Sequence, residues 1–168
     1  RIITALCPTT DFLGECLYKD NRKMVPDEEV KLRHVNYYLP YHEKIQSLLN
    51  ERKAQFGKVL LWDCHSIRQV VRTIQSDKFP DLILGDADEK SASTDFIAIA
   101  HSSLSSAEYS LNHNNPFKGG TITRTFGKPE KGQHALQLEM TKVNYMDDQE
   151  ENYHVDRANK MRQLLSHT

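Results

Sequence analysis

The hydrophobic pattern of the first third of the chain predicts helices that lead into a strand. Apolar residues recur at helical spacing over residues 28–56, and Gly57 is a good helix terminator. Pro40 either kinks this helical region or opens a second helix. The apolar run at 59–62 follows directly, and it predicts a strand at 58–64 that is buried on both faces.

The rest of the chain continues to interleave the two kinds of pattern. It predicts strands at 81–85, 109–112 and 134–140 and helices at 93–107 and 155–165. Ser91 or Ser93 can cap the first of these helices. Residues 1–26 are rich in turn formers and have no sustained period, so we interpret them as a surface loop. The interleaving predicts an α/β fold with a mixed, mostly parallel sheet and helices on both faces.

Size and composition limit the classes of protein that this chain can represent. A length of 168 residues suits a single domain with a real core. The 22 basic and 23 acidic residues nearly cancel, which argues against a surface for nucleic acid or anionic membrane. Cys7, Cys16 and Cys64 are odd in number and lack CxxC spacing, so they favour a reducing cytoplasm. Nothing in the sequence fixes the oligomeric state.

Polar residues that could take part in catalysis or metal binding cluster at the end of the predicted strand at 58–64. Asp63, His65 and Ser66 lie where functional residues of open α/β sheets gather, at the carboxyl end of a strand. One nitrogen of His65 could bind a metal while the other donates to a nearby acceptor. The alternative is a core histidine that closes the strand, and the two interpretations remain open on these residues alone.

A glycine-rich region later in the chain predicts unusual backbone angles or close approach to a ligand. Four of the seven glycines lie close together, namely Gly119, Gly120, Gly127 and Gly132. Lys118 before the first two suggests a phosphate loop, but the Gly-Lys-Ser/Thr core of such a loop is missing. Arg124 could bind a carboxylate through its planar guanidinium group, or it could be an ordinary surface arginine without a binding role.

Three acidic residues in one polar loop form a further candidate site. Asp86, Asp88 and Glu89 follow the predicted strand at 81–85. Such a cluster can bind a cation, although solvated loop acids are the commoner outcome.

Several segments of the chain resemble the N-formylglutamate amidohydrolase family. These segments are 7–10 with 14–18, 37–42, 61–68, 116–124, 126–129 and 134–139 with 145–147. They occur in the expected order over nearly the whole chain. The resemblance implies a zinc-dependent hydrolase with a carboxypeptidase-like α/β fold. Its small-molecule substrate would be N-formyl-L-glutamate, which it would split into formate and L-glutamate in histidine degradation.

The resemblance also implies roles for individual residues. His65 corresponds to a zinc ligand, and Glu139 corresponds to the catalytic base. Asp63 and Ser66 would not touch the metal but would orient the His65 side chain. The candidates for binding the substrate are Arg124, Arg68, Lys118, Gly119 and Gly120. Because Glu139 follows two leucines in its predicted strand, burial should raise its carboxyl pKa.

One departure from the family pattern shapes the expectation for this chain. Family members begin with a further segment that carries the other metal ligands, and residues 1–168 do not contain it. We therefore expect the larger C-terminal portion of the enzyme, inactive and metal-poor by itself, with an exposed sheet edge beside residues 59–62. Two alternatives remain: a hydrolase of another N-acyl amino acid, or a metal-free binding or interaction module.

Overall fold

The computed structural model describes residues 5–168, which divide into two compact units. The first unit extends to Leu48 and also includes Val71–Ser76. The second unit comprises Leu49–Val70 and Asp77–Thr168. No helix in this described part of the chain is long and apolar enough to cross a membrane.

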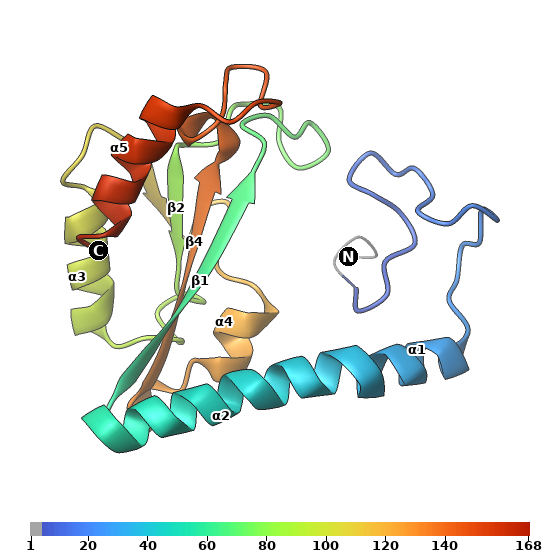
Figure 1. Ribbon diagram of the computed structural model, residues 1–168, viewed down its shortest axis with the longest axis horizontal. Coiled ribbons are helices and arrows are strands. Elements are labelled where there is room, and N and C mark those ends of the chain that lie inside the picture. The colour runs from blue at the N-terminus through green and yellow to red at the C-terminus, as the bar shows by residue number, and fades with distance from the viewer. Residues whose placement is uncertain (1–4) are drawn as a thin grey trace. The chain divides into compact units, whose positions relative to one another are not determined.

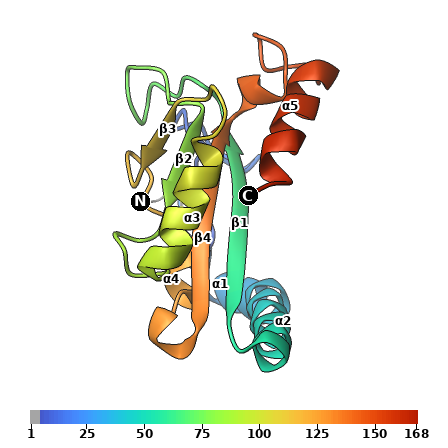
Figure 2. The same cartoon turned by 90° about the vertical axis from the view of Figure 1, so that its left-hand side faces the viewer.

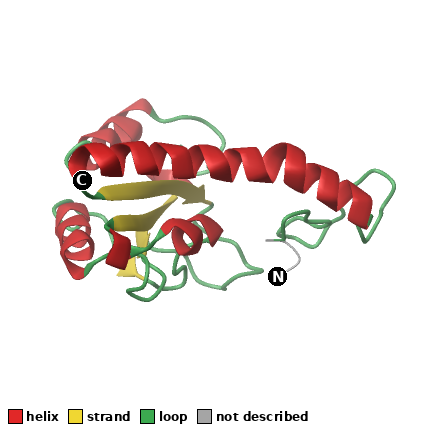
Figure 3. Ribbon diagram, turned by 90° about the horizontal axis from the view of Figure 1, so that it is seen from below, coloured by secondary structure: helices red, strands yellow, loops and turns green. Residues whose placement is uncertain are grey.

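The first unit begins with loops and turns over residues 5–26, as the sequence predicts (Figure 3). Charged and aromatic side chains hold part of this region together. The guanidinium groups of Arg22 and Arg33 both lie over the ring of Tyr18. Both groups also form ion pairs with Glu29. Because these side chains are partly exposed, the pairs contribute little stability individually.

The predicted helical region at 28–56 consists of three successive segments. They are α1 (Asp27–Arg33), a π-helical turn (His34–Tyr38) and α2 (Leu39–Phe56). Pro40 is the second residue of α2, so it lies just after the π-helical turn and does not end the helical region. Gly57 follows with a φ of +77°, a left-handed conformation that suits glycine and ends the helix.

A four-stranded sheet forms the centre of the second unit (Figures 1 and 2). Its strands are β1 (Val59–Ile67), β2 (Leu82–Gly85), β3 (Leu111–His113) and β4 (Gln133–Thr141). The order across the sheet is β1-β4-β2-β3. β1 is parallel to β4 and β2 is parallel to β3, whereas β2 is antiparallel to β4. This arrangement confirms a mixed, mostly parallel sheet.

The burial predicted for the strand at 58–64 is wrong. β1 continues to Ile67, and its residues are half-buried or exposed. The physical reason is its place in the sheet, because β4 is its only strand neighbour among residues 5–168. The exposed edge expected beside residues 59–62 is therefore confirmed. The two internal strands are the buried ones: β2 is buried throughout and β4 nearly throughout.

The two faces of the sheet differ in polarity because side chains alternate along each strand. On the apolar face, leucines of β2 and β4 form a buried core with helices α3 (Thr94–Leu104) and α5 (Val155–Leu165). Both helices appear at the predicted places. The buried residues of α5 are Ala158, Met161 and Leu164, whereas Val155 at its start is 60% exposed.

The other face, here called the polar face, carries Asp63 and His65 of β1 and Gln137, Glu139 and Thr141 of β4.

A short helix, α4 (Thr121–Phe126), packs on the polar face, opposite α3 and α5 (Figures 1 and 2). The Gln133 side chain ties it to β4, since Nε2 donates a 2.7 Å hydrogen bond to the carbonyl oxygen of Phe126. The sequence pattern predicts no helix at residues 121–124, so α4 is a correction. Helices on both faces of the sheet are confirmed.

The backbone of Gly127, at the end of α4, lies close to Ser91, and this contact provides a test of the packing. A Cβ atom there would lie 2.3 Å from Cβ of Ser91 and 2.5 Å from its Cα. We expect Gly127→Ala to lower the free energy of unfolding by roughly 3 kcal/mol, since the backbone must move. Gly57→Ala is the control, because it has open space and only a positive φ, and about 1 kcal/mol is expected. Urea denaturation measures both, and equal losses would contradict the packing described.

Candidate functional site

The polar face brings the main sequence-predicted residues together. In the parallel register, Asp63 lies beside Gln137 and His65 lies beside Glu139. Because paired residues of neighbouring strands point to the same side, these four side chains share one patch of the sheet. Asp63 and His65, two residues apart, meet for the same reason. The prediction that Asp63, His65 and Glu139 belong to one region is consistent with this register.

His65 and Asp63 form a directed pair. His65 Nε2 lies 3.1 Å from Asp63 Oδ1, and the imidazole is about half-exposed. The hydrogen bond to Asp63 raises the pKa of His65, burial opposes this, and the charges of Asp63 and Glu139 add to the rise. When Nε2 donates to Asp63, Nδ1 is left with a lone pair that can accept a proton or bind a metal.

Glu139 lies in a poorly solvated environment, as its position after two leucines predicts. It is only 8% exposed. The pKa of its carboxyl group is raised to about 7, chiefly by burial; the charge of His65 opposes this rise and the negative charge of Asp63 adds to it. A carboxyl group with a pKa near neutrality can both accept and return a proton. The chemistry that this environment favours is general acid–base catalysis.

Unsatisfied polar atoms gather on this same face. Among residues 5–168, the buried side-chain oxygens without a hydrogen-bond partner are Asp63 Oδ2, Gln137 Oε1, Thr141 Oγ1 and Thr123 Oγ1. The first three belong to the polar face, and Thr123 belongs to α4, which packs on it. Buried polar atoms normally have partners in protein, water or ligand. Asp63 and Gln137 lie beside each other in the register, so ordered water or a ligand between them would complete their hydrogen bonding.

The glycine-rich segment packs tightly against the sheet beside these residues. A Cβ on Gly85 of β2 would lie 2.5 Å from the backbone nitrogen of Gly119. A Cβ on Gly119 would meet the side chain of Thr123 at 3.0 Å, and Gly119 has a φ of +102°. A Cβ on Gly120 would lie 3.1 Å from Gln137 Oε1. The positive φ of Gly119 agrees with the unusual backbone angles that the sequence predicts, whereas the close approach is to the sheet and not to a ligand.

The three cationic candidates lie at the surface, and two of them border this segment. Arg124 is exposed, and its Nη1 donates a 2.8 Å hydrogen bond to the carbonyl oxygen of Gly119. Lys118 Nζ lies 3.0 Å from Asp88 Oδ2. Arg68 is exposed and follows the end of β1. All three side chains are open to solvent, and their roles in binding stay predictions.

Two polar residues are placed differently from the sequence interpretation. Ser66 follows His65 in β1 and so points to the other face, where its hydroxyl lies 2.9 Å from the Tyr145 hydroxyl. It is not part of the cluster around the imidazole.

Asp86 is not a solvated loop acid but fully buried. Burial alone raises its pKa, but hydrogen bonds from the Glu89 amide, Asn114 and His113 outweigh it and lower the pKa. Asp86 therefore acts as a structural anchor between β2 and β3.

Residues that the sequence did not single out complete the patch. Gln137 lies next to Glu139 on the same face, and its Nε2 is 3.5 Å from Glu139 Oε2. Thr123 is fully buried beneath the glycines. The alternation of β4 could have indicated Gln137, because residues two apart in a strand share a face. No sequence motif indicates Thr123.

The described residues do not complete a zinc site by themselves. Within residues 5–168, no three histidine, cysteine, aspartate or glutamate side chains are grouped to hold a metal ion. A catalytic zinc requires three protein ligands and an open position. The orientation of His65 by Asp63 does suit one ligand of such a site.

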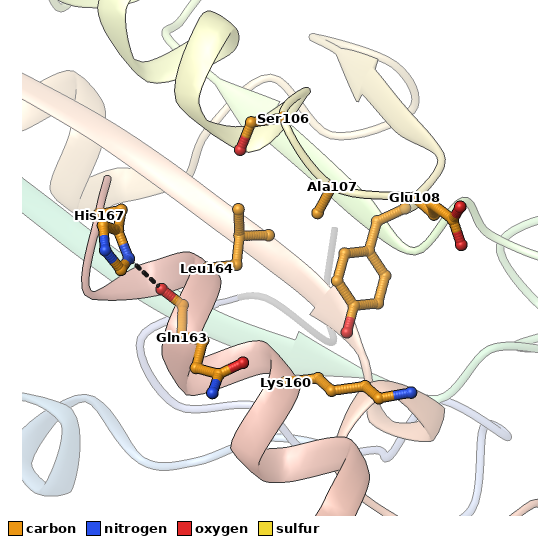
Figure 4. A pocket seen from close by; sticks show the side chains of 8 residues that line it. Ser106, Ala107, Glu108, Lys160, Gln163, Leu164 and His167 are labelled. Carbon is orange, nitrogen blue, oxygen red and sulfur yellow. Dashed lines mark hydrogen bonds between the residues drawn. The ribbon is translucent and has the colours of Figure 1, made fainter.

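A separate cavity of about 580 Å³ lies on the side of the sheet that carries α5. Figure 4 shows Lys160, Gln163, Leu164 and His167 facing the segment with Ser106 and Glu108. His167 Nδ1 lies 2.6 Å from the carbonyl oxygen of Gln163. None of the site residues that the sequence predicts lines this cavity. A choice of site by cavity volume alone would therefore have missed Glu139.

The fold and the polar face together define an α/β protein with a buried acid and an oriented imidazole on one sheet face. Comparison with known proteins makes the assignment specific. A profile of the N-formylglutamate amidohydrolase family matches residues 2–146. The chain belongs to the N-formylglutamate amidohydrolase family.

Individual relatives agree with this assignment. The chain is 40% identical over 148 residues to an N-formylglutamate deformylase of Pseudomonas aeruginosa, covering 87% of this chain and 55% of that protein. It is 38% identical over 151 residues to an N-formylglutamate deformylase of Pseudomonas putida, covering 88% and 55%. The chain thus spans about half the length of these relatives.

Solved structures share the fold. An N-formylglutamate amidohydrolase from Ralstonia eutropha superimposes with a TM-score of 0.79 at 22% identity, covering 95% of this chain and 57% of that one. A gene product of Agrobacterium tumefaciens gives a TM-score of 0.67 at 16% identity, with 95% and 60% covered. At these identities the likeness concerns the fold.

The raised pKa of Glu139 predicts a pH dependence of stability for the metal-free chain. Between its ordinary value of 4.5 and about 7, the folded state binds more protons than the unfolded state. The free energy of unfolding therefore falls as pH rises through this range, by at most about 3 kcal/mol. Glu139→Gln should remove this fall.

Urea denaturation at pH 5 and pH 8 would measure the effect. Glu130→Gln, which changes an exposed glutamate, is the control and should keep the wild-type difference between the two pH values. An unchanged pH dependence in Glu139→Gln would show that Glu139 titrates normally.

Proposed function

We propose that the full-length protein hydrolyses the formamide bond of N-formyl-L-glutamate and releases formate and L-glutamate. The observation that carries this proposal is Glu139, buried on the polar face beside His65 with a carboxyl pKa of about 7. Family membership and the names of the Pseudomonas relatives support the choice of substrate.

The proton transfers are assigned to Glu139. Its carboxylate accepts a proton from water as the water oxygen bonds to the formyl carbon. The same proton is then donated to the departing nitrogen as the carbon–nitrogen bond breaks. Burial suits this double role because in the metal-free chain it raises the carboxyl pKa to about 7. The net change is addition of one water across the formamide bond.

Recognition of the substrate is assigned to the glycine-rich segment and its cations. The substrate has two carboxylates, so at least one planar guanidinium partner is expected. The proposed partners are Arg68 and Arg124, and the latter also donates a hydrogen bond to the carbonyl oxygen of Gly119. Lys118, Gly119 and Gly120 would border the bound substrate.

His65 is proposed as one ligand of a zinc ion, with the other ligands outside residues 5–168. Asp63 would hold the imidazole through Nε2 and leave Nδ1 for the metal. A bound zinc would supply polarisation of the formyl oxygen. The three free cysteines fit the proposed setting, which is histidine degradation in the cytoplasm.

Glu139→Gln tests the assignment of the general base. The change keeps the shape of the side chain but removes proton transfer, so kcat should fall by about 10²–10⁴-fold in the full-length protein. Formate release from N-formyl-L-glutamate measures the rate, and acetate release from the N-acetyl analogue tests the choice of acyl group. A wild-type rate in Glu139→Gln would remove Glu139 from the mechanism.

His65→Ala tests the metal ligand separately from catalysis. The full-length variant should lose stoichiometric zinc, because a catalytic site depends on each of its few protein ligands. Metal content of the purified protein measures this directly. His154→Ala is the control, since His154 lies before α5 and away from the polar face, and it should retain zinc. Full zinc content in His65→Ala would show that His65 is not a ligand.

A further inference from the structure

Gln137 is a buried polar residue for which neither the fold nor the proposed proton transfers provide a role. It is 6% exposed, and it lies in the central region of β4, two residues before Glu139 on the same face. A buried amide in a sheet normally has partners for both its donor and its acceptor groups. Gln137 has a partner for only one of them.

The donor side of the amide faces Glu139. Gln137 Nε2 is 3.5 Å from Glu139 Oε2, which is the one hydrogen bond that the Glu139 carboxyl group makes within residues 5–168. The contact is long, but its direction is chemically sensible, because an N–H group stabilises a carboxylate oxygen. It leaves Oε1 of Glu139 as the carboxyl oxygen without a hydrogen bond from this part of the chain.

The acceptor side of the amide faces the glycine-rich segment. Gln137 Oε1 is buried without a partner among the described residues, and a Cβ on Gly120 would lie 3.1 Å from it. The close backbone of Gly120 therefore limits where the amide group can go. Gly120 in turn is the N-cap residue of α4, whose Thr123 packs against Gly119. The amide is confined between the glycine-rich segment and Glu139.

We propose that Gln137 is a positioning residue that orients the Glu139 carboxyl group, with its amide N–H directed at Oε2 so that Oε1 is the oxygen that takes the proton. This inference rests on the proposed function for the identity of the reaction, but the orientation itself is a property of the fold. A purely structural glutamine would be expected to satisfy its own acceptor, and Gln137 leaves that acceptor unpaired.

Gln137→Met is the decisive variant, because methionine keeps the length and volume of the side chain and removes both polar groups. Removing an unpaired buried acceptor should not destabilise the fold, so the urea midpoint should stay the same or rise. In the full-length protein, kcat for formate release should fall roughly tenfold to a hundredfold, since small misplacements of a catalytic group have effects of that size. KM should change far less than kcat, because the Gln137 amide contacts Glu139 and neither of the proposed carboxylate-binding arginines.

Thr141→Val is the matched control. Thr141 lies two residues after Glu139 on the same strand and face, is equally buried and also has an unpaired oxygen within residues 5–168. Its hydroxyl makes no described hydrogen bond to Glu139. The variant should keep kcat within about twofold of wild type. Crystal structures of both variants should show a displaced Glu139 carboxyl group only in Gln137→Met.

The kinetics of formate release and the crystal structures together separate this inference from the proposed function. A wild-type kcat in Gln137→Met, a rise in KM alone, or a fall in kcat with Glu139 undisplaced would overturn the positioning role. An equal fall in Thr141→Val would also overturn it, because the effect would then be general to the strand. If the wild-type protein releases no formate, the proposed function fails, and the crystal structures alone decide whether Gln137 orients Glu139.

Discussion

The in-register parallel pairing of β1 with β4 is the constraint on which the candidate site depends. The pairing runs without interruption from Val59 with Gln133 to Ile67 with Thr141, and it places His65 beside Glu139. A shift of one residue would turn one strand's polar residues towards the leucine core. The buried leucines therefore fix the register, and the register fixes the distance between the acid and the imidazole. Core packing and site geometry have a common origin in this pair of strands.

Patterns of local periodicity predicted much of this fold. The strand predicted at 134–140 is β4, and the helix predicted at 155–165 is α5 with the same limits. The position of Glu139 after two leucines also predicted its burial. Each of these features depends on side chains within one element, where alternation or helical spacing records which side faces the core.

Features that depend on strand order or on distant residues were not predictable in the same way. β1 has an apolar beginning like a central strand, but its half-exposed state follows from its place at the end of the sheet. Asp86 resembles a loop acid, and only His113 and Asn114, far along the chain, explain its burial. Gln137 is a neutral residue without a motif, so its relation to Glu139 and Gly120 needed the three-dimensional structure. The roles of His65, Arg124 and Glu139 in catalysis stay predictions.

The edge position of β1 also divides its backbone into two populations of amide groups. Val59 N donates to the carbonyl oxygen of Gly132 on the β4 side, so the amides of every second residue from there face β4. The intervening amides, including those of Trp62 and Cys64, point away from the sheet. Hydrogen exchange along β1 should therefore alternate between slow and fast residues while the strand itself remains folded. Any partner that added a strand to this edge would slow the fast set alone and so reveal where it binds.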